Sequence, residues 1–493
     1  MFILILDSVE DFHTVEERRL HRIFGGLFSS TTFLFCFLPV TLAGYYLIRK
    51  ELRNAFLLVM SLLFYAAGEP KFVFIMMASI IANYLLGFLL WKSRGSGKLL
   101  RRLFLLLALC VNLGILFYYK YFDFAVSNLN GIFGTSIALR HIALPIGISF
   151  FPFQGMSYVL DVYMGKSEVQ KNPLNVALYI ALFPQLIAGP IVRYSDINRE
   201  IVERRETIDD FASGVQRFTV GLSKKIVLSN SFALLADETF GTAPNELGMG
   251  MAWLGALAYT FQIYFDFSGY SDMAIGLGRM FGFHFLENFN YPYVSTSVTV
   301  FWRRWHISLS SWFRDYVYIP LGGNRRGNVY LHLLTVFFLT GLWHGASWNF
   351  VVWGLWHGFF LILERILRNK EVKILLPKTI EWMYTMLVVV IGWVFFRAVD
   401  LGAAIGYLRC MFGANGWNAL PVSYAISDYG ITFAIGVVCM LPLIPKIKEL
   451  AAIYVVPNRI IKLAEPVCCG VLLLIGIAYT VTSTYNPFIY FNF

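Results

Sequence analysis

The chain has 493 residues, of which 58% are hydrophobic and only 14% are charged. Its mean hydropathy is +0.63, and its apolar share exceeds the roughly 45–50% that is usual in soluble domains. The composition therefore excludes an ordinary soluble protein and predicts an all-α, polytopic integral membrane protein. The net charge of +10 does not indicate nucleic-acid binding, because the basic residues lie in short loops between apolar segments.

Apolar segments of about 17 to 25 residues are expected to cross the membrane, and we predict about 11 transmembrane helices. They lie near residues 33–48, 54–67, 72–91, 99–119, 142–163, 249–267, 331–350, 351–367, 380–396, 429–445 and 466–484. The loops on one side then collect 28 Lys and Arg residues, whereas the opposite loops carry only Lys71, Lys120, Arg140, Arg397 and Arg409. This asymmetry places the basic side in the cytoplasm and both chain termini outside.

Three further stretches do not fit simple spans. Residues 182–190 contain two prolines and a glycine within apolar sequence. Lipid tolerates such a backbone only where protein shields it or a cavity borders it, so we expect a re-entrant segment. Residues 211–235 and 301–318 interleave apolar and basic side chains, which is typical of amphipathic helices at the membrane interface.

The chain is expected to form one membrane domain over residues 27–493. Residues 1–26 differ in kind, because a short apolar run is followed at once by five acidic residues. We interpret them as an atypical N-terminal extension that is either disordered or not translated, with a translation start at Leu27. The six cysteines show no metal-ligand spacing, so we expect small buried apolar side chains and no metal site.

His344 is the first candidate for chemistry, because burying an imidazole in hydrocarbon is costly and usually marks a functional site. It lies about thirteen residues into the predicted 331–350 span, which is about 20 Å along a helix. Gly341, Gly345 and Ala346 flank it and leave room for a substrate or a neighbouring helix. We therefore expect His344 to be the active centre.

His306 lies 38 residues before His344. Its amphipathic segment either brings it to the same cavity or anchors the chain at the interface. His357 lies in a Gly-Leu-Trp-His-Gly sequence that repeats the one around His344. On one continuous helix the imidazoles of His344 and His357 would point about 220° apart, so they would not share a site. We expect a structural or supporting role for His357.

The basic residues around His306 allow two interpretations. They form a positive-inside loop, or they hold the phosphates of a cytoplasmic donor, which suits the guanidinium fork.

An H-x4-D arrangement, a G-x-S-x-G elbow and a Walker A loop are absent from the sequence. Asp266 and Asp272 fit either the wall of a polar cavity or the ion coupling of a transporter. Gly276, Gly278 and Gly282 favour close helix packing over dinucleotide binding.

Four ordered motifs resemble those of the membrane-bound O-acyltransferase (MBOAT) family. They are Glu287-Asn-Phe-Asn-Tyr-Pro-Tyr293, Phe301-Trp-Arg-Arg-Trp-His-Ile-Ser-Leu-Ser310, Trp312-Phe-Arg-Asp-Tyr316 with Tyr318-Ile-Pro-Leu-Gly-Gly-Asn-Arg325, and Gly341-Leu-Trp-His-Gly345. Phe28-Ser-Ser30 and Asn486-Pro-Phe-Ile-Tyr-Phe491 also look like the branch that acetylates alginate and other exported polysaccharides. The resemblance covers residues 27–493.

The resemblance implies a tunnel that joins a cytoplasmic donor entrance to an outer funnel for the acceptor. It implies that His344 is the central catalytic histidine and that His306 is the second polar position of the site. A neutral imidazole can take the proton of an attacking hydroxyl, and the second histidine would orient the acceptor or stabilise the oxyanion. The expected donor-binding or tunnel-lining residues are Arg303, Arg304, Trp305, Arg314, Asp315, Asn324 and Trp343.

The favoured function is transfer of a short acyl group, above all acetyl, to an exported polysaccharide or a relay partner. The thioester donor would be acetyl-CoA or an acyl carrier protein, with no tightly bound cofactor and no metal. The expected partners are membrane lipid, the polysaccharide or an extracytoplasmic acetyltransferase, and an acyl carrier protein, in the bacterial plasma membrane. The alternatives are D-alanyl transfer to teichoic acid and, in another class, a transporter or flippase of envelope precursors.

Overall fold

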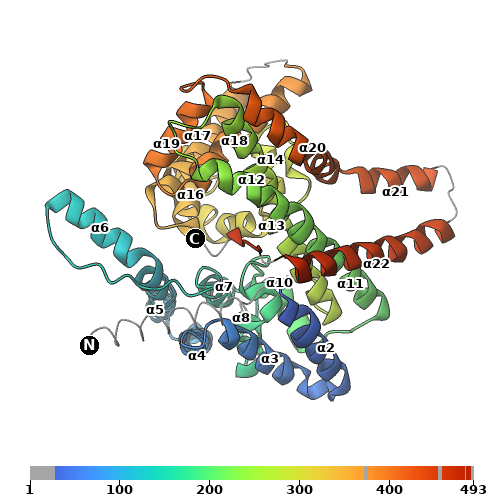
Figure 1. Cartoon of the computed structure of the whole chain (residues 1–493). Helices are drawn as coiled ribbons and strands as arrows, with labels where there is room; N and C mark the ends of the chain where they lie inside the picture. Colours follow the sequence, from blue (N-terminus) through green and yellow to red (C-terminus); the bar gives the residue numbers. More distant parts are fainter. Residues whose placement is uncertain (1–27, 371–375, 454–457, 484, 490–493) are drawn as a thin grey trace, which may run out of the picture.

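The computed structural model describes residues 28–370, 376–453, 458–483 and 485–489, and the regular elements in these ranges are helices (Figure 1). The expected N-terminal extension and the translation start at Leu27 lie outside the described residues. Up to residue 241 the α-helices are α2 (Leu38–Leu47), α3 (Arg53–Gly68), α4 (Val73–Lys92), α5 (Lys98–Leu116), α6 (Phe122–Phe133), α7 (Phe151–Met164), α8 (Pro173–Ala181), α9 (Phe183–Leu186), α10 (Tyr194–Val202), α11 (Ile208–Ser223) and α12 (Asn230–Gly241).

The second half of the chain is also helical. Its α-helices are α13 (Met249–Met280), α14 (Val298–Arg304), α15 (Ile307–Phe313), α16 (Val329–His344), α17 (Trp348–Asn369), α18 (Lys378–Arg397), α19 (Leu401–Met411), α20 (Ala419–Met440), α21 (Leu443–Ile453) and α22 (Asn458–Thr482). Short π-helical turns are η1 (Phe33–Phe37), η4 (Phe117–Tyr121), η5 (Lys224–Ser229) and η7 (Arg314–Tyr318). The 3-10 turns are η2 (Lys50–Leu52), η3 (Ser93–Gly95) and η6 (Pro292–Val294).

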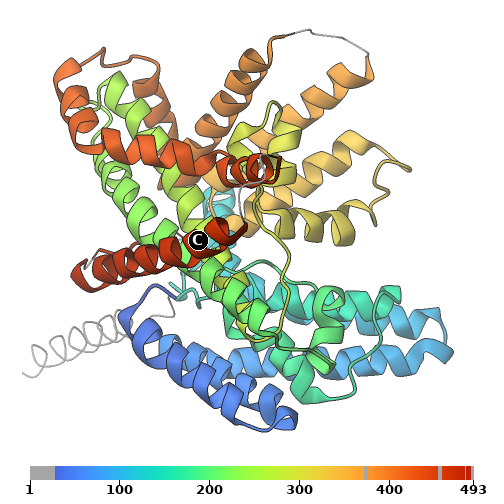
Figure 2. The same cartoon turned by 90° about the vertical axis from the view of Figure 1, so that its right-hand side faces the viewer.

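The long helix α13 joins the two halves of the molecule. Met273 and Leu277 near its C-terminal end belong to a hydrophobic core built mainly from the N-terminal helices. Tyr264 and Phe267, earlier in the same helix, belong to a second core built mainly from the C-terminal helices. Figure 1 shows α13 between the blue helices below and the orange helices above, and Figure 2 shows the helices of the two halves splaying apart away from it. Both halves are therefore positioned by one rigid element.

Glycine contacts hold α11 against α13 at very short range. A Cβ added to Gly221 would lie 2.5 Å from the carbonyl oxygen of Gly269, and one added to Gly214 would lie 2.6 Å from that of Gly276. These pairs run in opposite directions along the two helices, so the helices are antiparallel. The close packing expected for Gly276 is confirmed.

The two acidic residues of α13 are paired with basic residues from the α11 side. Asp272 accepts hydrogen bonds from Arg217 at 2.8 Å and from Lys224 at 2.7 Å. Asp266 lies 2.5 Å from Lys225, and each of these two side chains is only 1% exposed. Neither carboxylate lines either of the two pockets that His344 borders. Both close the seam between the two helices.

The expected membrane spans agree with the structure in seven places. Among the described residues, seven helices are long and apolar enough to cross a membrane, namely Lys50–Gly68, Val73–Gly95, Lys98–Phe133, Trp348–Asn369, Lys378–Arg397, Ala419–Met440 and Ala464–Thr482. Of the other four expected spans, 33–48 appears as the shorter apolar helix Phe33–Leu47. The expected boundary at 267 is wrong, because α13 continues to Met280.

Two expected spans are wrong because the helix is interrupted. In 142–163, only α7 is helical, and the preceding residues form an irregular segment that contains Pro145 and the left-handed Gly147 with φ of 76°. In 331–350, α16 ends at His344 and α17 begins at Trp348. Apolar composition alone does not distinguish an unbroken helix from one that stops within the protein interior.

The segments predicted to be irregular or interfacial differ in burial. Residues 182–190 are buried throughout, so the expected shielding of their backbone is confirmed. Residues 211–235 belong to a continuous helix from Ile208 to Gly241 that packs along α13. Residues 301–318 are not one amphipathic helix, because α14 and α15 are separated at His306. The tryptophans of this segment are buried, whereas Arg303 and Arg314 are exposed, so its placement at the membrane interface stays a prediction.

Two expectations about single side chains are also wrong. Lys120 was expected in an outer loop, but it lies within a continuous run of helix, in η4, and is only 9% exposed. The cysteines were expected to be buried, but only Cys410 is, Cys469 is intermediate, and the exposed ones are Cys36, Cys110, Cys439 and Cys468. Lipid accommodates a small apolar side chain on the outer face of a spanning helix as readily as the protein core does.

Replacing Gly221 with alanine tests the packing of α11 on α13. The added Cβ would lie 2.5 Å from the oxygen of Gly269 and 2.7 Å from the nitrogen of Met273, so the helices must separate. We expect a loss of about 1–3 kcal/mol in stability, seen as a lower thermal midpoint of the detergent-purified protein. Gly114→Ala is the matched control, because no atom lies within 4 Å of its added Cβ. Equal midpoints for Gly221→Ala and the wild type would contradict the packing.

His284 lies outside the spanning helices and bridges two carboxylates. Its Nδ1 lies 2.9 Å from Glu200, and its Nε2 lies 3.3 Å from Asp210. Partial burial alone would lower the pKa of His284, but the hydrogen bonds and charges of these carboxylates outweigh it and raise the pKa above 6.5. The bridge therefore stabilises the fold below the unfolded pKa of His and is lost as the pH rises through the raised value.

We expect His284→Gln to lower the thermal midpoint most at about pH 5.5 and much less at about pH 8.5, where the wild-type imidazole is also neutral. Thermal unfolding of the purified protein across this range measures the difference. If the thermal midpoint of His284→Gln is lower than that of the wild type by the same amount at every pH, the ring contributes packing and not charge.

Candidate active site

His344 lies where one helix stops and the next begins. It is the last residue of α16, the following Gly345 is extended with φ of −163°, and α17 begins three residues later. The two helices then pack antiparallel, with a Cβ on Gly341 placed 2.4 Å from the oxygen of Phe350. A Cβ on Gly354 would lie 2.3 Å from the oxygen of Phe337. Gly341, three residues before His344 on α16, thus makes room for the neighbouring helix.

His306 also occupies a break between two helices. It lies between α14 and α15 with φ of 46° and ψ of 53°, a left-handed conformation that is rare for residues other than glycine. Such backbone strain persists only where the surroundings enforce it, and it clusters at functional sites. The side chain is 1% exposed. Both candidate histidines therefore project from interruptions of helices.

The two histidines share one aromatic enclosure. Their ring centroids are 6.4 Å apart, and His344 is 5% exposed. The ring of His344 contacts three aromatic side chains, with centroid distances of 4.8 Å to Trp343, 4.9 Å to Trp353 and 5.1 Å to Phe396. His306 therefore lies beside His344, as expected, although it lines neither of the two pockets that His344 borders.

Asn288 fixes the protonation pattern of the His306 ring. The Oδ1 atom of Asn288 accepts the backbone N–H of Ser308 at 3.2 Å, which identifies that atom as the amide oxygen. His306 Nδ1 lies 3.1 Å from the same oxygen. Because an amide oxygen only accepts hydrogen bonds, Nδ1 carries the proton, and in the neutral ring Nε2 keeps its lone pair. Nε2 is buried, with no hydrogen-bond partner in the described part of the chain.

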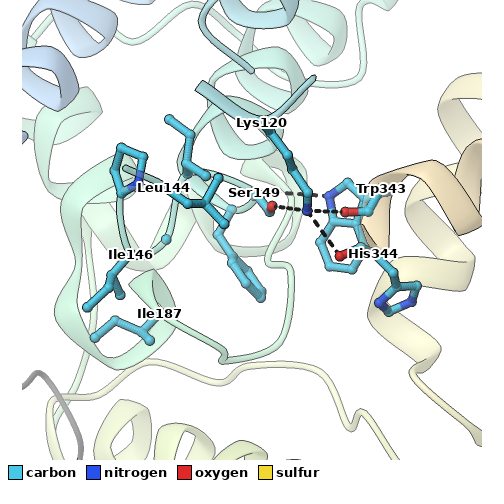
Figure 3. Close-up of a pocket in the computed structure, with 11 residues that line it drawn as sticks. Lys120, Leu144, Ile146, Ser149, Ile187, Trp343 and His344 are labelled. Carbon is cyan, nitrogen blue, oxygen red and sulfur yellow. Dashed lines mark hydrogen bonds between the residues drawn. The ribbon is translucent and has the colours of Figure 1, made fainter. Parts of the chain in front are cut away.

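His344 borders two small pockets of different character. The first has a volume of about 40 Å³, and its lining includes Lys120, Ser149 and Trp343 (Figure 3). That volume holds about three water molecules. The second has a volume of about 10 Å³ and, His344 apart, is lined by aromatic and aliphatic side chains, namely Ile263, Phe267, Trp305, Trp353, Trp393, Phe396 and Ile489.

Figure 3 shows that the carbonyl oxygen of His344 is directed toward Lys120, whereas its imidazole is turned to the opposite side. The Lys120 Nζ atom donates hydrogen bonds to the carbonyl oxygens of Trp343 at 2.6 Å and His344 at 3.2 Å, and to Ser149 Oγ at 2.9 Å. Sequence reasoning missed Lys120. The available signal was a single charge within the aromatic run 117–122.

The remaining predicted site residues divide into two groups. Trp305 and Trp343 are buried and line the two pockets. Five others line neither pocket, namely Arg303, Arg304, Arg314, Asp315 and Asn324. Arg303, Arg314 and Asn324 are exposed, and Arg314 donates to Asp315 at 2.7 Å. Their role in donor binding stays a prediction. Among the described residues, no group of His, Cys, Asp or Glu side chains is placed to hold a metal ion.

His357 packs behind the enclosure. Its ring lies 5.4 Å from Trp353, whose indole lies 4.9 Å from His344, so the indole separates the two imidazoles. His344 and His357 do not lie on one continuous helix, as was expected, because α16 ends at His344 and α17 begins at Trp348. The tryptophan in between, and not helical phase, keeps the two histidines apart.

Several known proteins are similar to this chain over much of its length. The pattern of the membrane-bound O-acyltransferase family matches residues 165–399. The protein named "Probable alginate O-acetylase AlgI" from Azotobacter vinelandii is 46% identical over 408 residues, 81% of this chain and 80% of the relative. The peptidoglycan O-acetyltransferase of Helicobacter pylori is 34% identical over 96% of this chain and 98% of the relative.

The teichoic acid D-alanyltransferase of Bacillus subtilis is 30% identical over 44% of this chain and 58% of the relative. The two O-acetyl-transferring relatives are thus more similar to this chain and match far more of it. Together with the helical fold and the paired histidines, these similarities settle the family. The chain belongs to the membrane-bound O-acyltransferase family of enzymes and is a multi-pass membrane protein.

Proposed function

We propose that this enzyme transfers an acetyl group from a cytoplasmic thioester donor to a hydroxyl of an exported cell-envelope polysaccharide or of a relay partner. The central observation is that the imidazoles of His344 and His306 lie 6.4 Å apart in a buried aromatic enclosure, and that His344 borders a small aromatic pocket. A buried neutral imidazole beside a small apolar pocket suits removal of a proton from an acceptor hydroxyl next to a short acyl group. Acetyl-CoA or an acyl carrier protein would supply the thioester.

The size of the aromatic pocket supports a short acyl group. Its volume of about 10 Å³ is close to that of one water-sized sphere. Indole and phenyl rings of Trp353, Trp393 and Phe396 restrict it. A longer acyl chain would have to displace these rings from a packed core, which costs stability. The extensive similarity to two O-acetyl-transferring relatives supports acetyl as the group and a polysaccharide of the envelope as the acceptor.

In the proposed reaction, neutral His344 acts as the general base. It removes the proton of the acceptor hydroxyl as the hydroxyl oxygen forms a bond to the carbonyl carbon of the thioester. The tetrahedral intermediate then collapses, the C–S bond breaks, and the thiolate leaves as the imidazolium gives up its proton. The products are an ester and a free thiol. No redox partner is needed.

The hydrogen bonds of His306 favour one of its two expected roles. With the proton on Nδ1, the Nε2 atom offers a lone pair, so it can accept a hydrogen bond from the acceptor hydroxyl. A lone pair cannot donate to an oxyanion. We therefore propose that His306 orients the acceptor and that oxyanion stabilisation comes from other donors.

The transporter alternative receives no support from the acidic residues that suggested it. Asp266 is paired with Lys225, and Asp272 is paired with Arg217 and Lys224. An ion-coupling carboxylate must exchange its partner during transport, whereas these pairs fasten two antiparallel helices to each other. Acyl transfer is the function that the site supports best.

His344→Ala tests the proposed centre. We expect the variant to lose acetyl transfer by at least about 10²-fold, because general-base catalysis typically contributes 10²–10⁴-fold, while it still reaches the membrane. Labelled acetate incorporated into extracellular polymer measures activity, and fluorescence-detected size exclusion measures folded protein. Labelled D-alanine in parallel distinguishes the alternative acyl group. Undiminished acetate incorporation by His344→Ala would refute the role of His344 as the base. Incorporation of D-alanine alone by the wild type would show that D-alanyl, and not acetyl, is the transferred group.

Asn288→Leu tests the control of the His306 tautomer. The variant removes the oxygen that accepts from His306 Nδ1 and from Ser308, so the ring loses its preferred protonation and orientation. We expect activity per folded molecule to fall about 10–100-fold, as is typical when a residue that orients a functional histidine is lost. Asn112→Leu is the matched control, because Asn112 pairs with Asn83 in a buried site away from both pockets. Equal activity of the two variants would reject this role.

A further inference from the structure

One lysine is buried against the backbone of the proposed base. Lys120 is 9% exposed, and within the described part of the chain none of its contacts is a carboxylate. Its ammonium has three N–H donors, and three acceptors surround it: the carbonyl oxygens of Trp343 and His344, and the hydroxyl of Ser149. All donors are used, so Lys120 has none left for a substrate. Its action must pass through these neighbours.

The partners of Lys120 identify what it does for α16. The last four carbonyl groups of an α-helix accept no hydrogen bond from an N–H group within the helix. Leaving them without a hydrogen bond in an apolar interior is costly. At the end of α16, the oxygen of Gly341 accepts the N–H of Gly345 at 3.3 Å. The remaining three carbonyls have no such backbone partner among the described residues.

Side chains from η4 satisfy those three carbonyls. The hydroxyl of Tyr121 donates to the oxygen of Leu342 at 2.6 Å, and Lys120 donates to the oxygens of Trp343 and His344. A π-helical turn is a local widening of the helix that recurs at functional sites. Here it presents two consecutive side chains to the same helix end. The C-terminus of α16 is thus capped from another helix.

We propose that Lys120 is a positioning residue of this acyltransferase, which fixes the peptide of His344 so that the imidazole remains in the aromatic enclosure. The inference rests on the proposed role of His344 as the base. Ser149 extends the effect, because its hydroxyl accepts from Lys120 while its carbonyl accepts from the indole of Trp343 at 3.1 Å. One nitrogen atom therefore ties the pocket wall to the backbone of the base (Figure 3).

The test is Lys120→Met, which keeps a similar length and removes the three donors. We expect kcat for acetyl transfer to fall about 10–100-fold with the donor KM unchanged, because a shift of about 1 Å in a catalytic group costs up to about 10²-fold. Lys120→Arg, which retains donors, should recover part of the rate. Tyr118→Phe is the matched control: this residue of the same turn is 41% exposed and should leave kcat unchanged.

Two comparisons separate this inference from the proposed function. If His344→Ala remains active, the proposed function fails. If His344→Ala is inactive while Lys120→Met keeps the wild-type kcat, only the positioning role of Lys120 is overturned. A fall in kcat accompanied by an equal rise in donor KM would also overturn it, because a shifted base should not weaken donor binding.

Hydrogen exchange supplies a readout besides activity. We expect the amides of residues 341–348 to exchange faster in Lys120→Met than in the wild type, while those of α13 are unchanged. If Lys120→Met does not fold, the same comparison is made with Lys120→Gln, whose shorter side chain has two N–H donors for the three acceptors and should still loosen this helix end. Unchanged exchange at residues 341–348 in the folded variant would overturn the proposal.

Discussion

The site depends on how the interior of this protein accommodates the ends of helices. Water that would bind free carbonyl and N–H groups is scarce there, so each interruption of a helix must bring its own polar partners. At His344 those partners are the ammonium of Lys120 and the hydroxyl of Tyr121. After His306, Asn288 accepts the N–H of Ser308. Functional side chains thus occur where satisfying the backbone already requires a polar group.

The sequence was most informative where one short motif contains both a residue for close helix packing and a candidate catalytic residue. The Gly-Leu-Trp-His-Gly motif around His344 indicated the proposed active centre and, through Gly341, a close helix contact. Proline and glycine in residues 182–190 correctly indicated a shielded backbone. The family that the motifs indicated is confirmed by the match over residues 165–399 and by a relative that is similar over 96% of this chain.

Other features could not be predicted, because they depend on partners far away in the sequence. Hydropathy cannot show that α16 stops at His344, since apolar residues continue on both sides of the break. Lys120 resembled a loop residue because two of its three acceptors, the carbonyl oxygens of Trp343 and His344, are more than 200 positions later. Asn288 belonged to a recognised motif, but its effect on the His306 ring depends on a left-handed backbone that brings Ser308 to the same oxygen.

The ion pair between Lys225 and Asp266 has a consequence for biogenesis. The two residues are 41 positions apart, and each is 1% exposed in the finished protein. At about 5–20 residues per second, the ribosome delivers Lys225 about 2–8 s before Asp266. During that interval the lysine cannot enter hydrocarbon with a neutralising partner. We therefore expect the helix from Ile208 to Gly241 to stay at a polar site, in water or at the insertion machinery, until α13 has been made.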